Sequence, residues 1–185
     1  MAETKIRDMT PQEVEERTEA RDLLKRYLGR YTGAKRRLRR LRQREAEVRA
    51  SIGIGAAASD GMPHGSAPGR TIENQVTHLS TAEERVSTQR KLSADIMTEI
   101  VCMIDLLPTE STEREVLELR YLEGRSWNSI ETTGGLYLCH TAIFAAHKRG
   151  LDMLLEIPAV QTTLSEYRDL LEAEGKLNEK KGEQK

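Results

Sequence analysis

The chain has 185 residues, 37% hydrophobic and 32% charged, with one Phe, one Trp and a formal net charge of −1. So few aromatic residues exclude a single large globular core and favour a protein of long, largely exposed helices. No apolar run approaches the length that spans a bilayer, and the N-terminus lacks a signal-peptide stretch, so we expect a soluble, cytoplasmic protein with no membrane partner.

The first predicted helix covers residues 11–52 and follows a disordered tail over residues 1–10. The pair Thr10-Pro11 predicts its start, because Thr is a favourable N-cap and Pro suits the first helical position. Gly29 and Gly33 each weaken a helix by about 1 kcal/mol relative to Ala. A kink or break is therefore expected near these two glycines.

This helix is strongly basic. Residues 25–49 carry 11 Lys and Arg against two Glu, a net charge of +9, so the rest of the chain sums to −10. The densest run is either the solvated face of a helix pair or a surface that binds phosphates or acidic protein. We favour contact with double-stranded DNA, because the excess charge is more than solubility requires. The candidate residues are Lys35, Arg36, Arg37, Arg39 and Arg40.

A linker rich in Gly and Pro over residues 53–70 leads to a second predicted helix over residues 71–107. Both helices repeat apolar side chains at spacings of three and four, as in a coiled-coil seam. The first seam contains Leu24, Tyr27, Tyr31, Ala34, Leu38, Leu41 and Val48, with Glu45 in one place. The second contains Ile72, Val76, Leu79, Val86, Ser93, Met97, Ile100, Ile104 and Leu107, with Glu83 and Arg90 in two places.

The two seams allow two arrangements. The helices either fold back as an antiparallel hairpin, in which the Arg-rich middle of the first passes near Glu83, or pair with a second protomer to form a homo-oligomer. The pattern does not choose between them.

Residues 108–156 are predicted to form a helix-turn-helix module. Thr112 and Glu115 have the spacing of a capping box, and Gly124 ends that first helix in a left-handed conformation. Ser126 caps a second short helix over 127–133, and Gly134-Gly135 permits a sharp turn. A longer helix over 138–156 follows. This arrangement lays its last helix in the major groove of DNA.

The longer helix divides into an inward and an outward face. Ile143, Ala146, Leu151 and Leu154 fall on the inward stripe. On the outward face, we expect base contacts near the helix N-terminus and phosphate contacts further along. The candidate DNA-binding residues are His140 and Thr141 for bases, Phe144 for a thymine methyl or else the core, and Lys148 and Arg149 for phosphates. Trp127 is predicted to anchor the module. The module has a net charge of −3, unusual for a DNA-binding domain.

Residues 113–130 resemble the start of RNA polymerase sigma-factor region 4, and residues 147–151 resemble the end of its recognition helix. Over roughly residues 20–156, including the linker segment 59–65, the chain resembles the phage-encoded RinA/ArpU-like late-gene transcription regulators. The resemblance implies a phage or prophage regulator that binds promoter DNA and acts with host RNA polymerase in the bacterial cytoplasm. The chain departs from the family at Cys139, a usual Ser cap, at Ala145, often Arg, and at Tyr137, commonly Gly.

Residues 157–185 are predicted to form a short helix and a polar tail from Gly175. The histidines and the two cysteines lack the spacing of a metal site, and no catalytic set or cofactor fingerprint is present. We therefore expect no enzyme, no cofactor and no metal, and expect Cys102 and Cys139 to be reduced packing residues.

The sequence thus predicts an all-α transcription regulator with an N-terminal coiled-coil hairpin and a C-terminal helix-turn-helix. Two alternatives remain. One is a phage DNA-packaging protein like a small terminase subunit, although those usually place the helix-turn-helix first. The other is a helical protein-interaction module without sequence-specific DNA binding.

Overall fold

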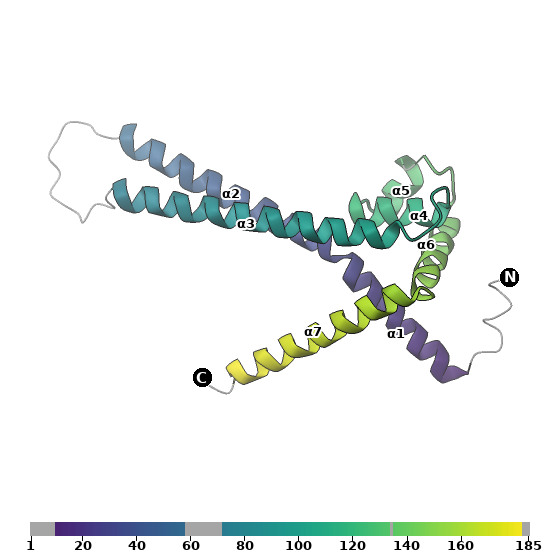
Figure 1. Ribbon diagram of the computed structural model, residues 1–185. Coiled ribbons are helices and arrows are strands. Elements are labelled where there is room, and N and C mark those ends of the chain that lie inside the picture. The colour runs from purple at the N-terminus through teal and green to yellow at the C-terminus, as the bar shows by residue number, and fades with distance from the viewer. Residues whose placement is uncertain (1–9, 58–71, 134, 183–185) are drawn as a thin grey trace. The chain divides into compact units, whose positions relative to one another are not determined.

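The computed structural model describes residues 10–57, 72–133 and 135–182, and every regular element in these ranges is a helix (Figure 1). The helices are α1 (Pro11–Leu28), α2 (Arg30–Ala57), α3 (Ile72–Ile104), α4 (Thr112–Leu117), the π-helix η1 (Glu118–Leu122), α5 (Trp127–Thr133), α6 (His140–Leu155) and α7 (Pro158–Gly182). None of the helices in these ranges is both long and apolar enough to cross a membrane.

The chain forms two compact units. Unit 1 comprises residues 1–30 and 99–185, and unit 2 comprises residues 31–98. This division differs from the expected one, because α1 packs with the C-terminal helices α6 and α7. Residues 1–9 of the expected tail (1–10) and residues 58–70 of the expected linker (53–70) lie outside the described residues.

The single helix expected over 11–52 is two helices. It begins as predicted, with a capping box in which the Glu13 N–H donates to Thr10 Oγ1 at 3.4 Å and the Thr10 N–H donates to the Glu13 carboxylate at 2.7 Å. The break comes at Gly29, while Gly33 lies inside α2. α2 then continues past Ile52 to Ala57.

In unit 2, α2 and α3 contact each other in opposite directions. Residues 37–44 line one groove with residues 84–92, and residues 48–52 line another with residues 75–78. Arg49 also pairs with Glu83 at 2.8 Å. The Arg-rich middle of α2 therefore lies opposite residues 84–92, which directly follow the expected neighbour Glu83 in α3.

The predicted seam of α3 is wrong at alternate positions. Leu79 and Val86 are half-buried and Ser93 is buried, as expected, but Val76 and Met97 are 55% and 41% exposed. Glu83 and Arg90, also assigned to the seam, are exposed. The less exposed side chains lie one residue earlier in each heptad: Gln75, Ala82, Gln89 and Ile96.

Both choices continue a spacing of three and four from Leu79, so spacing alone does not separate them. The observed register keeps the charges of Glu83 and Arg90 in water, and burying a charge costs more than burying the amide of Gln89. The consequence is a seam that is poor in large apolar side chains.

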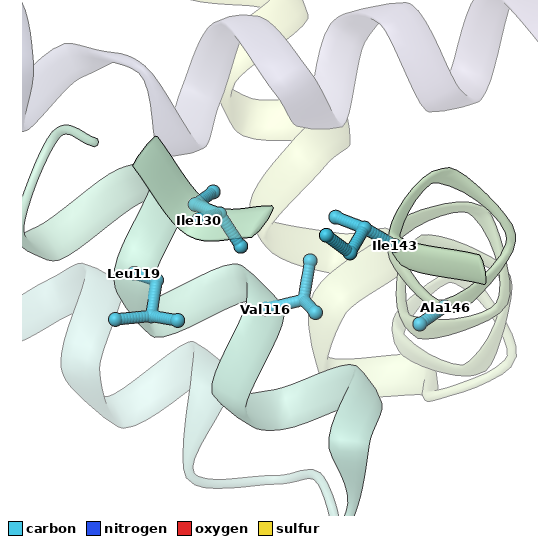
Figure 2. Packing of buried hydrophobic residues seen from close by; sticks show 5 residues of the cluster. All are labelled: Val116, Leu119, Ile130, Ile143 and Ala146. Carbon is cyan, nitrogen blue, oxygen red and sulfur yellow. The ribbon is translucent and has the colours of Figure 1, made fainter. Parts of the chain in front are cut away.

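In unit 1, α4 begins one residue away from the expected cap. Ser111 is the N-cap, and its hydroxyl accepts a hydrogen bond from the Arg114 N–H at 3.3 Å, so Thr112 is the first helical residue. The helix widens into η1 and ends as predicted at Gly124, whose φ of 76° is left-handed. α4, η1, α5 and α6 enclose a cluster of buried apolar residues (Figure 2). The cluster consists of Val116, Leu119, Ile130, Ile143 and Ala146.

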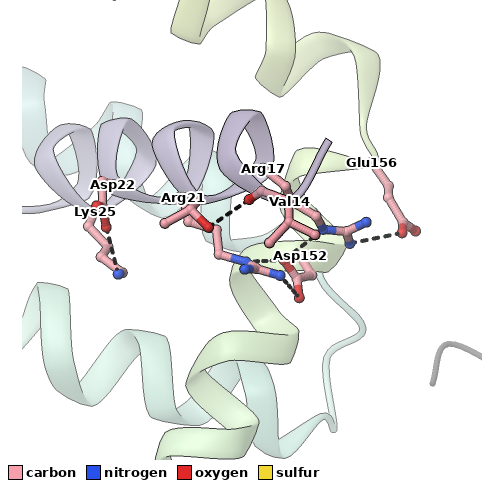
Figure 3. A network of polar contacts seen from close by, with 8 residues as sticks. Val14, Arg17, Arg21, Asp22, Lys25, Asp152 and Glu156 are labelled. Carbon is pink, nitrogen blue, oxygen red and sulfur yellow. Dashed lines mark hydrogen bonds and ion pairs between the residues drawn. The ribbon is translucent and has the colours of Figure 1, made fainter. Parts of the chain in front are cut away.

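The remaining helices of unit 1 extend this core. α1 packs against α6 and α7, and buries Leu24 and Leu28 completely. Figure 3 shows the polar side of the α1–α6 contact, where Arg21 Nη2 donates to Asp152 Oδ2 at 2.9 Å and Arg17 joins the same carboxylate at 3.3 Å. α1 is therefore part of the structural unit that contains α6.

The expected short last helix is 25 residues long. α7 begins at Pro158, as the fixed φ of Pro favours, but continues through Gly175 to Gly182. The Glu, Lys and Ala residues over 172–181 favour helix strongly enough to offset one glycine. The polar tail expected from Gly175 is therefore helical for most of its length.

Candidate nucleic-acid interface

The short helix α5 is placed by the cap that the sequence predicts. The Ser129 N–H donates to Ser126 Oγ at 3.2 Å, and α5 begins at the next residue, Trp127. In the turn that follows, Gly135 has a φ of 75°, as expected of a glycine turn, while Gly134 lies outside the described residues. The turn between α5 and α6 therefore includes a residue, Gly135, in the left-handed backbone conformation.

Tyr137 shares that left-handed conformation. Its φ is 51°, and its side chain is 99% exposed. A residue with a Cβ is strained in this region by about 1–2 kcal/mol. Tyr137 therefore carries a cost in backbone strain, and no burial of the ring offsets it.

α6 starts at His140, two residues later than expected, and Cys139 is its N-cap without a side-chain capping bond. The missing cap is replaced from another helix, because the His140 N–H donates to Glu131 Oε1 of α5 at 3.2 Å. A carboxylate there also suits the positive end of the helix dipole. Glu131 thus supplies a hydrogen bond to the N-terminus of α6 that the Cys139 side chain does not make.

The inward and outward faces of α6 are as the sequence predicts. Ile143, Ala146, Leu151 and Leu154 are buried, and the five candidate residues and Ala145 are exposed. Gly150 is also buried, and a Cβ on it would lie 3.2 Å from both Glu113 Cβ and Leu117 Cδ1. α4 therefore approaches α6 so closely that a side chain at this position would have to displace Glu113 or Leu117 by a few tenths of an ångström.

The aromatic side chains near the start of α6 form a continuous group. The ring centroids of Trp127 and Phe144 are 4.5 Å apart, those of His140 and Phe144 are 4.7 Å apart, and the Arg120 guanidinium lies 4.5 Å from the Trp127 centroid. Trp127 packs against the cluster of Figure 2, while Phe144 is 40% exposed. Phe144 thus packs on Trp127 and still presents an edge to solvent.

A buried polar pair in this region was missed by the sequence analysis. Tyr121 Oη and His147 Nε2 are 3.0 Å apart, and both residues are buried. Burial lowers the pKa of His147 to about 4, helped by the charges of Lys25 and Arg120, and burial raises the pKa of Tyr121 to about 12. The available signal was helical spacing, since His147 lies four residues from both Ile143 and Leu151 on the inward stripe.

The two cations expected to bind phosphates from α6 have different surroundings. Arg149 Nε donates to Glu113 Oε1 of α4 at 2.8 Å, although its side chain is 57% exposed. Burial raises the pKa of Glu113, but the hydrogen bond from Arg149 outweighs it and the net pKa is lowered. A phosphate would have to compete with this carboxylate for Arg149, whereas no such contact involves Lys148 among the described residues.

The five basic candidates of α2 are all exposed, but they do not share one face. At 100° per residue, Arg36, Arg39 and Arg40 project away from the seam formed by Leu38 and Leu41. Arg37 lies beside the seam in the groove with residues 84–92, and Lys35 lies 5.8 Å from the Tyr31 ring centroid. The α2 candidates belong to unit 2 and the α6 candidates to unit 1.

Two findings bear on other chemistry. Within the described ranges, no three His, Cys, Asp or Glu side chains are grouped so that they could hold a metal ion. Cys102 and Cys139 are both exposed free thiols, so the expectation that they are packing residues is wrong.

No family model, curated protein or solved structure matches the chain.

Proposed function

We propose that the chain is a sequence-specific DNA-binding protein, a transcriptional regulator of a phage or prophage, in which α5 and α6 act as a helix-turn-helix. The observation that carries this proposal is the exposed face of α6. Three helical segments share one apolar core with α6, yet the side chains from His140 to Lys148 on its opposite face remain in solvent. A helix held on one side and free along the other can enter a major groove.

The side chains on that face have separate roles in the proposal. Thr141 and His140 stand at the N-terminal end of α6, where base edges are reached, and Phe144 supports the His140 ring. Lys148 contacts phosphate, and Arg149 does so by exchanging Glu113 for a phosphate oxygen.

We further propose that α2 and α3 form an antiparallel coiled-coil hairpin that supplies phosphate affinity. The module of residues 108–156 has a net charge of −3, whereas residues 31–98 carry 12 Lys and Arg against seven Asp and Glu, a net of +5. Counterion release from DNA would then come mainly from unit 2. The resemblance to late-gene regulators adds host RNA polymerase as a partner of the DNA-bound protein.

Selection of binding sites from random double-stranded DNA with the full chain tests the proposal. Thr141→Ala should lose about 1–3 kcal/mol of discrimination at particular base pairs, with non-specific binding unchanged. Thr162→Ala is the matched control, because Thr162 is also an exposed helical threonine but lies on α7. Equal affinity of the wild-type chain for all sequences would contradict site-specific recognition.

A protein-interaction module is the second candidate, because unit 1 has a net charge of −6 and an open groove of about 480 Å³. Leu106 and Leu170 line that groove and are 48% and 63% exposed. The absence of DNA binding at low salt, together with capture of a protein partner that a Leu170→Glu change abolishes, would favour it. A ring-shaped oligomer in solution would instead favour the packaging-protein alternative.

A further inference from the structure

One edge of the α2–α3 pair gathers arginines from both helices. Arg37 and Arg44 of α2 and Arg85 of α3 line the same groove, of about 520 Å³. Leu41 and Leu92 also line the groove, along with Glu84, Thr88 and Gln89. Neither Arg44 nor Arg85 was among the candidates from the sequence. Arg85 is separated from the basic run of α2 by more than 40 residues, so the sequence alone does not group the two.

The opposite edge of the pair is different. There Arg49 makes ion pairs with Glu83 at 2.8 Å and with Glu45 at 2.9 Å, as expected between paired helices. The groove is lined by three arginines and by one carboxylate, that of Glu84. None of the three arginines makes an ion pair with any residue in the described part of the chain.

Arginines from two helices in one groove repel each other, which destabilises the helix pair. A bound anion reverses the sign of that interaction. The planar fork of Arg matches phosphate oxygens, and the apolar side chains of Leu41 and Leu92 suit the sugars between successive phosphates. A phosphodiester backbone carries both features at once, whereas an acidic side chain carries only the charge.

We propose that this groove binds the phosphate backbone of double-stranded DNA, with Arg37, Arg44 and Arg85 as its ligands. The inference rests on the proposed function and deepens it, because it assigns the phosphate contacts of unit 2 to one edge of the helix pair. Arg36, Arg39 and Arg40, which project away from that edge, are not part of this site.

The experiment compares the salt dependence of DNA binding by the full chain and two variants that lose one positive charge each. Arg85→Gln should lower the slope of log affinity against log salt by about 1, so that the affinity lost between about 50 and 200 mM salt falls by about fourfold. Lys91→Gln is the matched control. Lys91 is exposed on the face of α3 that points away from α2, and its loss should leave the slope nearly unchanged.

Thermal melting of each variant establishes that it folds, and removal of a like-charged side chain should not lower the melting temperature. Equal slopes for Arg85→Gln and Lys91→Gln, with wild-type DNA binding intact, would overturn the groove assignment and leave the proposed function standing. A wild-type chain that binds no DNA would overturn both. If Arg85→Gln weakened binding of polyglutamate but not of DNA, the groove would be a site for acidic protein and the inference would be wrong.

Discussion

Units 1 and 2 are both helical, but they are held together differently. The largest fully buried side chains of the described residues, among them Leu24, Ile100 and Leu154, all belong to unit 1. Unit 2 buries Ala34 and Ile96 and, beside them, the polar Gln89 and Ser93. Hydrophobic burial scales with apolar area, so most of the stability of the chain should reside in unit 1.

The two units also differ in net charge. Unit 1 has a net charge of −6 and many specific ion pairs, such as Arg21 with Asp152, whereas unit 2 has a net charge of +5. Unit 2 combines a lean core with a dense surface charge. The comparison indicates that the stability of unit 1 depends on its apolar core around α6, whereas unit 2 has little apolar core and a basic surface.

The largest expected effect is a difference in the free energy of unfolding lost when a leucine is truncated in each of the two cores. Leu154→Ala in unit 1 should cost about 2–5 kcal/mol, because the side chain is fully buried. Leu41→Ala in unit 2 should cost less, about 1–2 kcal/mol, because Leu41 is half-buried. Trp127 is the sole Trp of the chain, so its fluorescence follows denaturation of unit 1, while circular dichroism follows both units. Similar costs for the two changes would contradict the comparison.

The buried His147 predicts that acid acts on unit 1. Its pKa is lowered to about 4 in the folded chain, from about 6.5 when unfolded, so the unfolded state takes up the proton first. The associated stability is complete above about pH 6.5 and is lost as the pH falls towards 4. The loss is on the order of 3 kcal/mol.

Trp127 reports this loss directly, since its ring lies 5.0 Å from that of His147. The Tyr121 hydroxyl lies 3.0 Å from the imidazole, and the charges of Lys25 and Arg120 add to the lowering of the His147 pKa by burial. His147→Gln should flatten the pH dependence of unfolding over this range. A profile that is unchanged in His147→Gln would assign the acid sensitivity to carboxylates instead.

A smaller effect tests whether the seam of unit 2 is short of apolar side chains. Gln89 is 6% exposed, and its amide donates to Ser93 Oγ at 3.5 Å. Gln89→Leu should stabilise unit 2 by about 1 kcal/mol, because apolar burial replaces a weak hydrogen bond. The gain should be visible in circular dichroism and absent from Trp127 fluorescence. Destabilisation would show that the polar seam specifies the register of the two helices.

The smallest expected effect concerns the turn before α6. Tyr137→Gly should stabilise unit 1 by about 0.5–1 kcal/mol, since relief of the left-handed strain exceeds the entropy cost of glycine. Tyr137→Ala keeps the strain and is the control. A chain that melts at the same temperature with Gly and with Ala would show that the φ of this residue is not a source of strain.

Local signals in the sequence determined much of unit 1. The Ser126 cap, the Gly124 stop and the inward stripe from Ile143 to Leu154 were predicted as they occur, because caps, left-handed glycines and helical period depend on neighbouring residues. The break near Gly29 follows from the same kind of information.

Tertiary structure decided those features for which local signals in the sequence allow more than one arrangement. Two registers of α3 continue the same spacing from Leu79, so spacing alone does not choose between Gln89 and Arg90; packing against α2 places Gln89 in the seam and keeps the charge of Arg90 in water. Likewise, nothing in the sequence of α1 assigns it to α6; Arg21 and Asp152 are separated by 131 residues and meet only in the folded chain. Contacts that are distant in sequence carry no periodic signature, so the grouping of α1 with the C-terminal helices and of Arg85 with Arg44 was settled by packing and not by pattern.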